Sequence, residues 1–339
     1  MKPNQNQTVP KTLLITSLLA LAAGLSAHAQ TYVSSEASTY DSSITPLGQG
    51  NNAIVTANTQ SVANNACVPT ATANGLSYLE AYQTGLGNPD PFSATPDTYP
   101  TVNTLIGNMG TTASGTSTTG QMNGLWSYLQ AKAATVSLSG QVAPVEKNNL
   151  PGYYGSGNFN AGYSANVQSA NPNAQYLYNA LQAKSAVELG LLWGSYNSAA
   201  GGSFSFTGGH EETLEGINMT AGTGSFNLLD PWGSNGVGNN AGTAGALDQS
   251  YSVQTITLNG IAGSFLLLTY TGTILAGDQS EVPPTDLSSP SSETVGFGTP
   301  IGAQALLIDD AVEAVPEPST IAFLGLGAVA LAARLRRKA

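Results

Sequence analysis

The chain has 339 residues and few charges, with nine Lys and Arg against 20 Asp and Glu and a formal net charge of −11 at pH 7. Residues 30–315 keep three lysines, no arginine and 19 of the acidic residues. Nucleic acids and anionic lipid surfaces bind clustered Lys and Arg, so the composition argues against both as partners. This stretch is long enough for one large domain or two small ones.

Residues 1–29 have the pattern of a secretory signal peptide. Two lysines precede the apolar run of residues 13–21, and small residues stand at Ala27 and Ala29. This order predicts cleavage after Ala29, which makes Gln30 the mature N-terminus. An uncleaved anchor is the alternative, but the apolar run is short and no stop-transfer pattern follows it.

Two helices are predicted in the first half of the chain. Residues 30–58 are polar and predict an extended arm. The next helix begins at Cys67, because Pro69 suits a first turn and Gly85 ends the pattern. Its apolar side chains recur at helical spacing, at Ala73, Leu76, Leu79 and Tyr82. Residues 88–120 are typical of a loop, and a second helix is predicted at residues 121–133.

The second half is predicted to be richer in strands. A strand at residues 135–142 is followed by a Gly- and Asn-rich insertion at 146–173 and a third helix at 174–184. Further strands are predicted at residues 186–193, 210–217, 225–229, 251–258 and 264–271. Helices followed by strands form an α+β pattern. Residues 275–314 are rich in Pro and Ser and predict a linker.

Cys67 is the only cysteine, and His210 is the only histidine that remains once the signal peptide is removed. A helix N-terminus favours a thiolate, which suits Cys67 as a nucleophile. His210 begins a predicted strand, and Asp230 would lie beside it if the two strands form an antiparallel hairpin. Each residue also has an ordinary structural interpretation: a buried helix cysteine, a strand histidine and a turn aspartate.

The segments Cys67-Val68-Pro69-Thr70-Ala71, Gly209-His210 and Asp230-Pro231-Trp232-Gly233 resemble the C39-like branch of the papain-fold cysteine peptidases. The roughly 140 residues between the cysteine and the histidine fit the spacing of papain-type enzymes. The resemblance covers about residues 58–235.

This resemblance implies a papain-like α+β fold for residues 30–274, with the cysteine helix packed on a C-terminal antiparallel sheet. It implies Cys67 as nucleophile, His210 as general acid/base and Asp230 as the orienting acid, acting on a peptide or protein substrate without cofactor or metal. In the family a Gln about six residues before the cysteine donates to the oxyanion. Gln60 lies seven residues before Cys67, and Asn64 or Asn65 are the alternatives.

The strand after His210 departs from the family pattern, because Glu211, Glu212 and Glu215 stand where related peptidases usually carry apolar residues. Three carboxylates near an imidazole would raise its pKa and favour imidazolium. Glu211, Glu212 and Asp230 would also suit a weak Ca²⁺ site. The alternative function is therefore a papain-like surface or biofilm matrix protein that has lost its activity.

The C-terminal residues 315–339 combine Pro316-Glu317-Pro318, an uncharged run at 321–333 and a basic end. A 13-residue helix rises about 20 Å, less than a permanent membrane span needs. The basic end is expected to stay cytoplasmic. The arrangement resembles the PEP-CTERM sorting signal of Gram-negative bacteria. That resemblance implies an exosortase-type protease as partner, a transient inner-membrane anchor at 321–333, and delivery to the cell surface or extracellular matrix. A simple weak anchor is the alternative.

Overall fold

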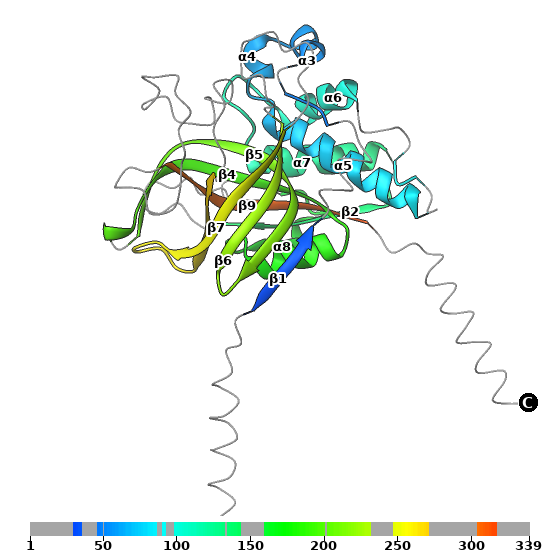
Figure 1. Cartoon of the computed structure of the whole chain (residues 1–339). Coiled ribbons are helices and arrows are strands. Elements are labelled where there is room, and N and C mark those ends of the chain that lie inside the picture. The colour runs from blue at the N-terminus through cyan, green and yellow to red at the C-terminus, as the bar shows by residue number, and fades with distance from the viewer. Residues whose placement is uncertain are drawn as a thin grey trace, which may run out of the picture.

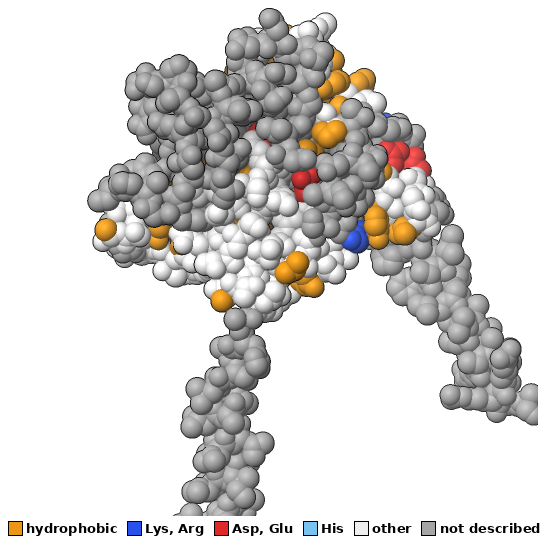
Figure 2. Space-filling model, in the orientation of Figure 1, with side chains coloured by type: hydrophobic (Ala, Val, Ile, Leu, Met, Phe, Trp, Pro, Cys, Tyr) orange, Lys and Arg blue, Asp and Glu red, His pale blue; other side chains and the backbone are white. Residues whose placement is uncertain are grey.

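The computed structural model describes residues 30–35, 46–49, 51–86, 90–92, 98–132, 134–143, 159–200, 202–231, 247–270 and 304–316. The predicted signal peptide and most of the predicted sorting tail lie outside these residues. On the face that Figure 2 presents, acidic and basic side chains are sparse among the coloured residues, as the composition leads one to expect.

In the described part of the chain, nine strands form one sheet, whose strands and flanking helices are seen in Figure 1. The strands are β1 (Thr31–Ser35), β2 (Val136–Val142), β3 (Val167–Ser169), β4 (Ala186–Asn197), β5 (Ser203–Thr220), β6 (Thr223–Asp230), β7 (Leu247–Thr257), β8 (Ser264–Tyr270) and β9 (Gln304–Pro316). From β4 to β9 each strand pairs antiparallel with the next, and β9 pairs back onto β4. These six strands therefore close into a barrel. Outside the ring, β1 pairs with β5, β2 with β9, and β3 runs parallel to β2.

The described residues also form six α-helices that pack next to this sheet. They are α3 (Asn52–Ala57), α4 (Gln60–Ala63), α5 (Cys67–Gly85), α6 (Tyr99–Met109), α7 (Thr118–Ala131) and α8 (Ala174–Gln182). Helices α3 to α7 gather on one side of the sheet, whereas α8 lies apart from them near β1 (Figure 1). Short 3-10 turns occupy Ser164–Asn166 and Ser198–Ala200.

The predicted papain-like α+β fold is wrong. The described residues form a mostly β structure around a closed six-stranded antiparallel barrel with extra strands. A sheet built only from the strands predicted up to residue 271 would have open edges. Here β9 bonds to β4 on one side and to β8 on the other, which removes two of these edges.

The end of the predicted linker at 275–314 is corrected by strand β9. Residues 304–314 form most of this strand and are not a spacer. Leu307, Ile308, Ala311 and Val312 are fully or almost fully buried in β9. The Pro- and Ser-rich composition is confined to the residues before the strand. A domain that ends at residue 274 would therefore lack the strand that closes its barrel.

Most local predictions are confirmed within one to four residues, including the helices α5, α7 and α8 and the strand β2. Strand β5 begins at Ser203 instead of residue 210, and the predicted insertion contains β3. Two further segments differ in type. Residues 52–57 are the helix α3 instead of an extended arm, capped by the Asn51 side chain, which accepts from the N–H of Ala53. Residues 99–109 are the helix α6 instead of a loop. Its buried side chains at Val102, Leu105 and Ile106 do have helical spacing.

Helix α5 lies directly against β4 and β5, and this contact fixes the position of Cys67. The hydroxyl of Thr213 on β5 donates to the carbonyl of Ala71, 3.0 Å away. One turn further along α5, Gly75 lies so close to β4 that a Cβ there would overlap Oε1 of Glu188. Side chains of β4 and β5 therefore reach the backbone of α5 directly.

None of the helices in the described residues is both long and apolar enough to cross a membrane. The run predicted as a short transmembrane helix, residues 321–333, lies outside the described part of the chain.

Candidate active site

Cys67 is the first residue of α5 and carries a free, partly buried thiol. The N-cap residue is Ala66, and no side chain caps this helix. The third residue, Pro69, has no N–H group. The first-turn N–H groups of Cys67 and Val68 are therefore positioned to bind a negative charge next to the thiol.

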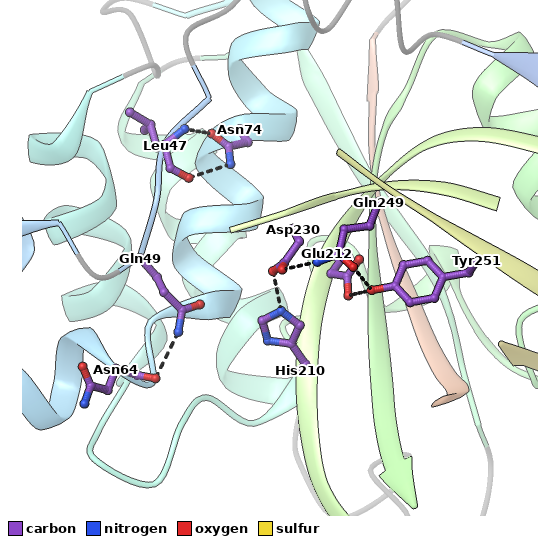
Figure 3. Close-up of polar contacts among 9 residues, drawn as sticks. All are labelled: Leu47, Gln49, Asn64, Asn74, His210, Glu212, Asp230, Gln249 and Tyr251. Carbon is purple, nitrogen blue, oxygen red and sulfur yellow. Dashed lines mark hydrogen bonds and ion pairs between the residues drawn. The ribbon is translucent and has the colours of Figure 1, made fainter. Parts of the chain in front are cut away.

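His210 and Asp230 form a buried pair. Nε2 of His210 lies 2.8 Å from Oδ1 of Asp230 (Figure 3), and the two residues are 7% and 1% exposed. Their strands β5 and β6 form the antiparallel hairpin expected from the sequence. Gln249 on β7 donates from Nε2 to the other oxygen of Asp230 at 2.7 Å. The carboxylate is thus held on both sides.

Cys67 and His210 line the same pocket, which has a volume of about 400 Å³. Asn65, Gln121 and Glu211 are among the other side chains on its wall. Cys67 and His210 therefore border one pocket, and Asp230 is linked to it only through its hydrogen bond to the imidazole.

Gln60, the predicted oxyanion donor, does not line this pocket. It is exposed on α4, and its Nε2 donates to Oδ1 of Asn64 at 2.7 Å. Asn65 does line the pocket, but its Nδ2 donates to the carbonyl of Ser61 at 2.9 Å. The first-turn N–H groups of Cys67 and Val68, two residues that line the pocket, are then the remaining candidate oxyanion donors.

The carboxylates that follow His210 are divided between the two faces of the sheet. His210 and Glu212 pair with Leu191 and Leu189, which belong to the barrel core, whereas Glu211 pairs with Gly190 on the opposite face. Glu212 accepts from the hydroxyl of Tyr251 at 2.9 Å (Figure 3). The imidazole therefore has one adjacent glutamate on its own face.

Burial raises the pKa of Glu212 to about 8, and the neighbouring charge of Asp230 adds to this rise in pKa. Most Glu212 side chains are therefore protonated at neutral pH. The negative charge in contact with the imidazole is then that of Asp230.

Asp309 and Asp310 on β9 also line the pocket and were missed from the sequence. Gly190 pairs with Asp310 and Leu191 with Ile308, so Asp309 is the extra residue of a β-bulge. The bulge interrupts the alternation of side chains and lets both aspartates face the pocket. Burial raises the pKa of Asp310 to about 6 and that of Asp309 well above its usual range. An Asp-Asp pair within an apolar run is the signal that could have identified them.

A second missed feature is the segment of residues 46–49, which is hydrogen-bonded both to α5 and to the residue that follows β6. Asn74 accepts from the N–H of Leu47 at 2.7 Å and donates to its carbonyl at 3.1 Å (Figure 3). The N–H of Gln49 donates to the carbonyl of Pro231 at 2.7 Å. The residue next to Asp230 is thereby tied to the helix that carries Cys67.

The described His, Asp and Glu side chains include one group that could share a metal ion, formed by His210, Glu212 and Asp230. Their possible ligand atoms lie within 4.8 Å of one another. Glu211, which the sequence had suggested for a Ca²⁺ site, points to the other face of β5 and is not in this group. That the protein acts without a metal ion remains a prediction from the sequence.

The buried carboxylates predict an unusual dependence of stability on pH. The pKa rises from 4.5 to about 8 for Glu212 and from 3.8 to about 6 for Asp310 when the chain folds. From pH 4.5 to about pH 8 for Glu212, and from pH 3.8 to about pH 6 for Asp310, the folded state binds more protons than the unfolded state. The free energy of unfolding therefore falls as the pH rises through these ranges. We expect the melting temperature to drop by at least about 5 °C between pH 5 and pH 8.5. Thermal unfolding followed by circular dichroism measures this.

A Glu212→Gln variant is the control, because it keeps an acceptor for Tyr251 and removes one titrating group. Its melting temperature should fall less steeply over the same pH range. A melting temperature that rises from pH 5 to pH 8.5 in the unsubstituted protein would show that these carboxylates are not buried as described.

Comparison with known families gives one match, which lies at the C-terminal end. A family model described as the PEP-CTERM protein-sorting motif matches residues 314–338. No curated protein and no solved structure matches the chain significantly. The match gives no support for a C39-like peptidase domain. It identifies the chain as an exported protein that is sorted by an exosortase to the cell surface or matrix.

Proposed function

We propose that this exported protein is a cysteine-dependent hydrolase that cleaves peptide bonds with Cys67, His210 and Asp230. One observation carries the proposal: a thiol at an uncapped helix N-terminus shares a pocket with an imidazole that is hydrogen-bonded to a buried carboxylate. These are the three parts that an activated thiol nucleophile needs. The proposal depends on this arrangement and not on a papain-like fold.

In this mechanism Asp230 holds Nε2 of His210, so Nδ1 is the nitrogen that takes the proton from the thiol of Cys67. The thiolate attacks the substrate carbonyl carbon, and the N–H groups of Cys67 and Val68 bind the developing oxyanion. His210 then donates its proton to the leaving amine, and a thioester remains on Cys67. Water, deprotonated by His210, hydrolyses the thioester and restores the thiol.

The sorting route belongs to the same proposal. Residues 321–333 would hold the exported chain briefly in the inner membrane, and an exosortase-type protease would cut near Pro316-Glu317-Pro318 after the signal peptide has been removed at Ala29. Pro316 is the last residue of β9. Cleavage beyond this residue leaves every strand of the barrel in the released protein.

Substitution of Cys67 tests the proposal directly. We expect the full chain to cleave members of a peptide library and Cys67→Ala to lose this activity by at least about a thousandfold. Iodoacetamide should label Cys67 faster in the unsubstituted protein than in His210→Ala, because the imidazole favours the thiolate. If Cys67→Ala cleaves the library as fast as the unsubstituted protein, Cys67 is not the nucleophile.

A catalytically inactive surface or matrix protein is the second candidate function. The position of Gln60 favours it, because this amide lies on the surface and cannot reach an oxyanion in the pocket. Slow alkylation of Cys67 at the same rate with and without His210, together with no cleavage of the library, would support this candidate.

A further inference from the structure

The predicted signal cleavage after Ala29 makes Gln30 the first residue of the mature chain, and the sheet begins directly after it. Strand β1 starts at Thr31, which pairs with Thr220 on β5. The carbonyl of Gln30 itself accepts from the N–H of Ala221 at 3.2 Å. Chain ends are usually poorly ordered unless a sheet or a docked helix holds them. The sheet therefore holds the mature N-terminus in one place.

The side chain of Gln30 is exposed and borders open space. Gln30 lines a second pocket, of about 250 Å³, together with Asn173 and Gln175 at the start of α8. Its Nε2 donates to Oε1 of Gln175 at 2.6 Å, in an exposed hydrogen bond. In Figure 1, β1 lies beside α8. The amide of Gln30 is thus on the surface, with room around it for a change in its covalent structure.

An N-terminal glutamine carries a nucleophile and an electrophile in one residue. An α-amino group ordinarily titrates at roughly pH 8, so part of it is uncharged and nucleophilic at neutral pH. Its nitrogen can attack Cδ of the side-chain amide of the same residue, which closes a small lactam ring. Because both groups are linked through the same Cα, the attack is intramolecular and needs no other reactant.

We propose that Gln30 is a modification site, which closes to pyroglutamate after the signal peptide has been removed. The bond between the α-nitrogen and Cδ forms, and the bond between Cδ and Nε2 breaks. Nε2 leaves as ammonia and takes a proton from the attacking amine, so atoms and electrons balance without an oxidant or reductant. The product has neither a primary amine nor a positive charge at its N-terminus.

The position of Gln30 at the edge of the fold favours this outcome. Proteases trim chain ends that are free to enter their active sites. Here the backbone from Thr31 onward is paired with β5, so Gln30 keeps its place at the N-terminus while the ring closes. Ring closure ends the donation from Nε2 to Gln175, which water can replace because the contact is exposed, and the carbonyl still accepts from Ala221.

The proposal rests on the cleavage after Ala29 that belongs to the proposed function, and not on the triad. To test it, the full chain is exported from a Gram-negative host, and free amines of the folded protein are dimethylated before digestion. A glutamyl endopeptidase that cuts after Glu36 then releases residues 30–36, which contain no Lys. We expect this peptide to be lighter than its sequence requires by about 17 Da, the mass of ammonia, and to carry no label.

Gln30→Asn is the matched control, because it keeps a side-chain amide but is one methylene too short to close the same ring. Its peptide 30–36 should have the full mass, and its α-amine should carry at least about tenfold more label than that of the unsubstituted protein. The same loss of mass in Gln30→Asn would overturn the proposal, because the ammonia would then not come from closure of this ring.

The other outcomes separate the modification from the functions proposed above. A labelled peptide that begins with intact Gln30 overturns the modification and leaves the signal cleavage supported. A first residue other than Gln30 overturns both. Peptide hydrolysis by Gln30→Asn should equal that of the unsubstituted protein, because Gln30 does not line the pocket of Cys67 and His210. Loss or absence of hydrolysis therefore bears on the triad alone.

Discussion

Replacing Asp230 with Ala is expected to lower kcat/KM for peptide cleavage by about ten-thousandfold, the order of magnitude found when the orienting acid of a catalytic triad is changed. The 2.8 Å contact between Asp230 and Nε2 of His210 determines which ring nitrogen carries a proton and stabilises the imidazolium. Without it the ring can adopt the other tautomer. Steady-state kinetics on the best library peptide measures the effect.

Asp230→Asn is the isosteric variant, because the amide keeps the shape of the carboxylate and removes its charge. We expect a loss of about ten-thousandfold here too, since the amide NH₂ can donate to Nε2 and hold the ring in the wrong tautomer. The alkylation rate of Cys67 should fall in both variants.

Glu313→Gln is the matched control for these variants. Glu313 is also a buried acid in the barrel, but its Oε2 accepts from Ser139 and Tyr176, at 2.7 and 2.9 Å. An equal loss of activity in Glu313→Gln and Asp230→Ala would mean that general destabilisation, and not the orientation of His210, explains the effect.

The candidate triad could be predicted from the sequence because this chain offers few alternatives. One cysteine and one histidine lie outside the predicted signal peptide, and the helical spacing after Cys67 indicates that it begins a helix. Asp230 could be found because β5 and β6 are adjacent in sequence and joined by a tight turn. Local patterns were sufficient for these residues.

The closed barrel could not be predicted in the same way, since closure depends on pairing between distant segments. Strand β9 follows a long Pro- and Ser-rich stretch, and its carboxylates interrupt the apolar pattern that identifies buried strands. The acidic wall of the pocket was missed for the same reason. Asp309 and Asp310 face the pocket together because of a bulge, and the register of β4 against β9 that creates the bulge is a property of the folded sheet.

Replacing Gly75 with Ala is expected to destabilise the protein by about 2 kcal/mol, although Ala is intrinsically about 1 kcal/mol better than Gly within a helix. The new Cβ would overlap Oε1 of Glu188 and lie 3.1 Å from Cβ of Ala186. Glu188 has little freedom to move, because it is fully buried and β4 is paired on both sides. The melting temperature should fall by about 4 °C or more.

Gly107→Ala provides the control for this prediction, since Gly107 lies within α6 and a Cβ there meets no heavy atom within 4 Å. This variant should be as stable as the unsubstituted protein or slightly more stable. Combining Gly75→Ala with Glu188→Ala removes the overlapping carboxylate and should recover part of the loss, which a double-mutant cycle measures as a coupling energy. Because α5 carries Cys67, a shift of this helix should also slow the alkylation of the thiol. Equal stability of Gly75→Ala and Gly107→Ala would show that α5 does not lie against β4 as closely as described.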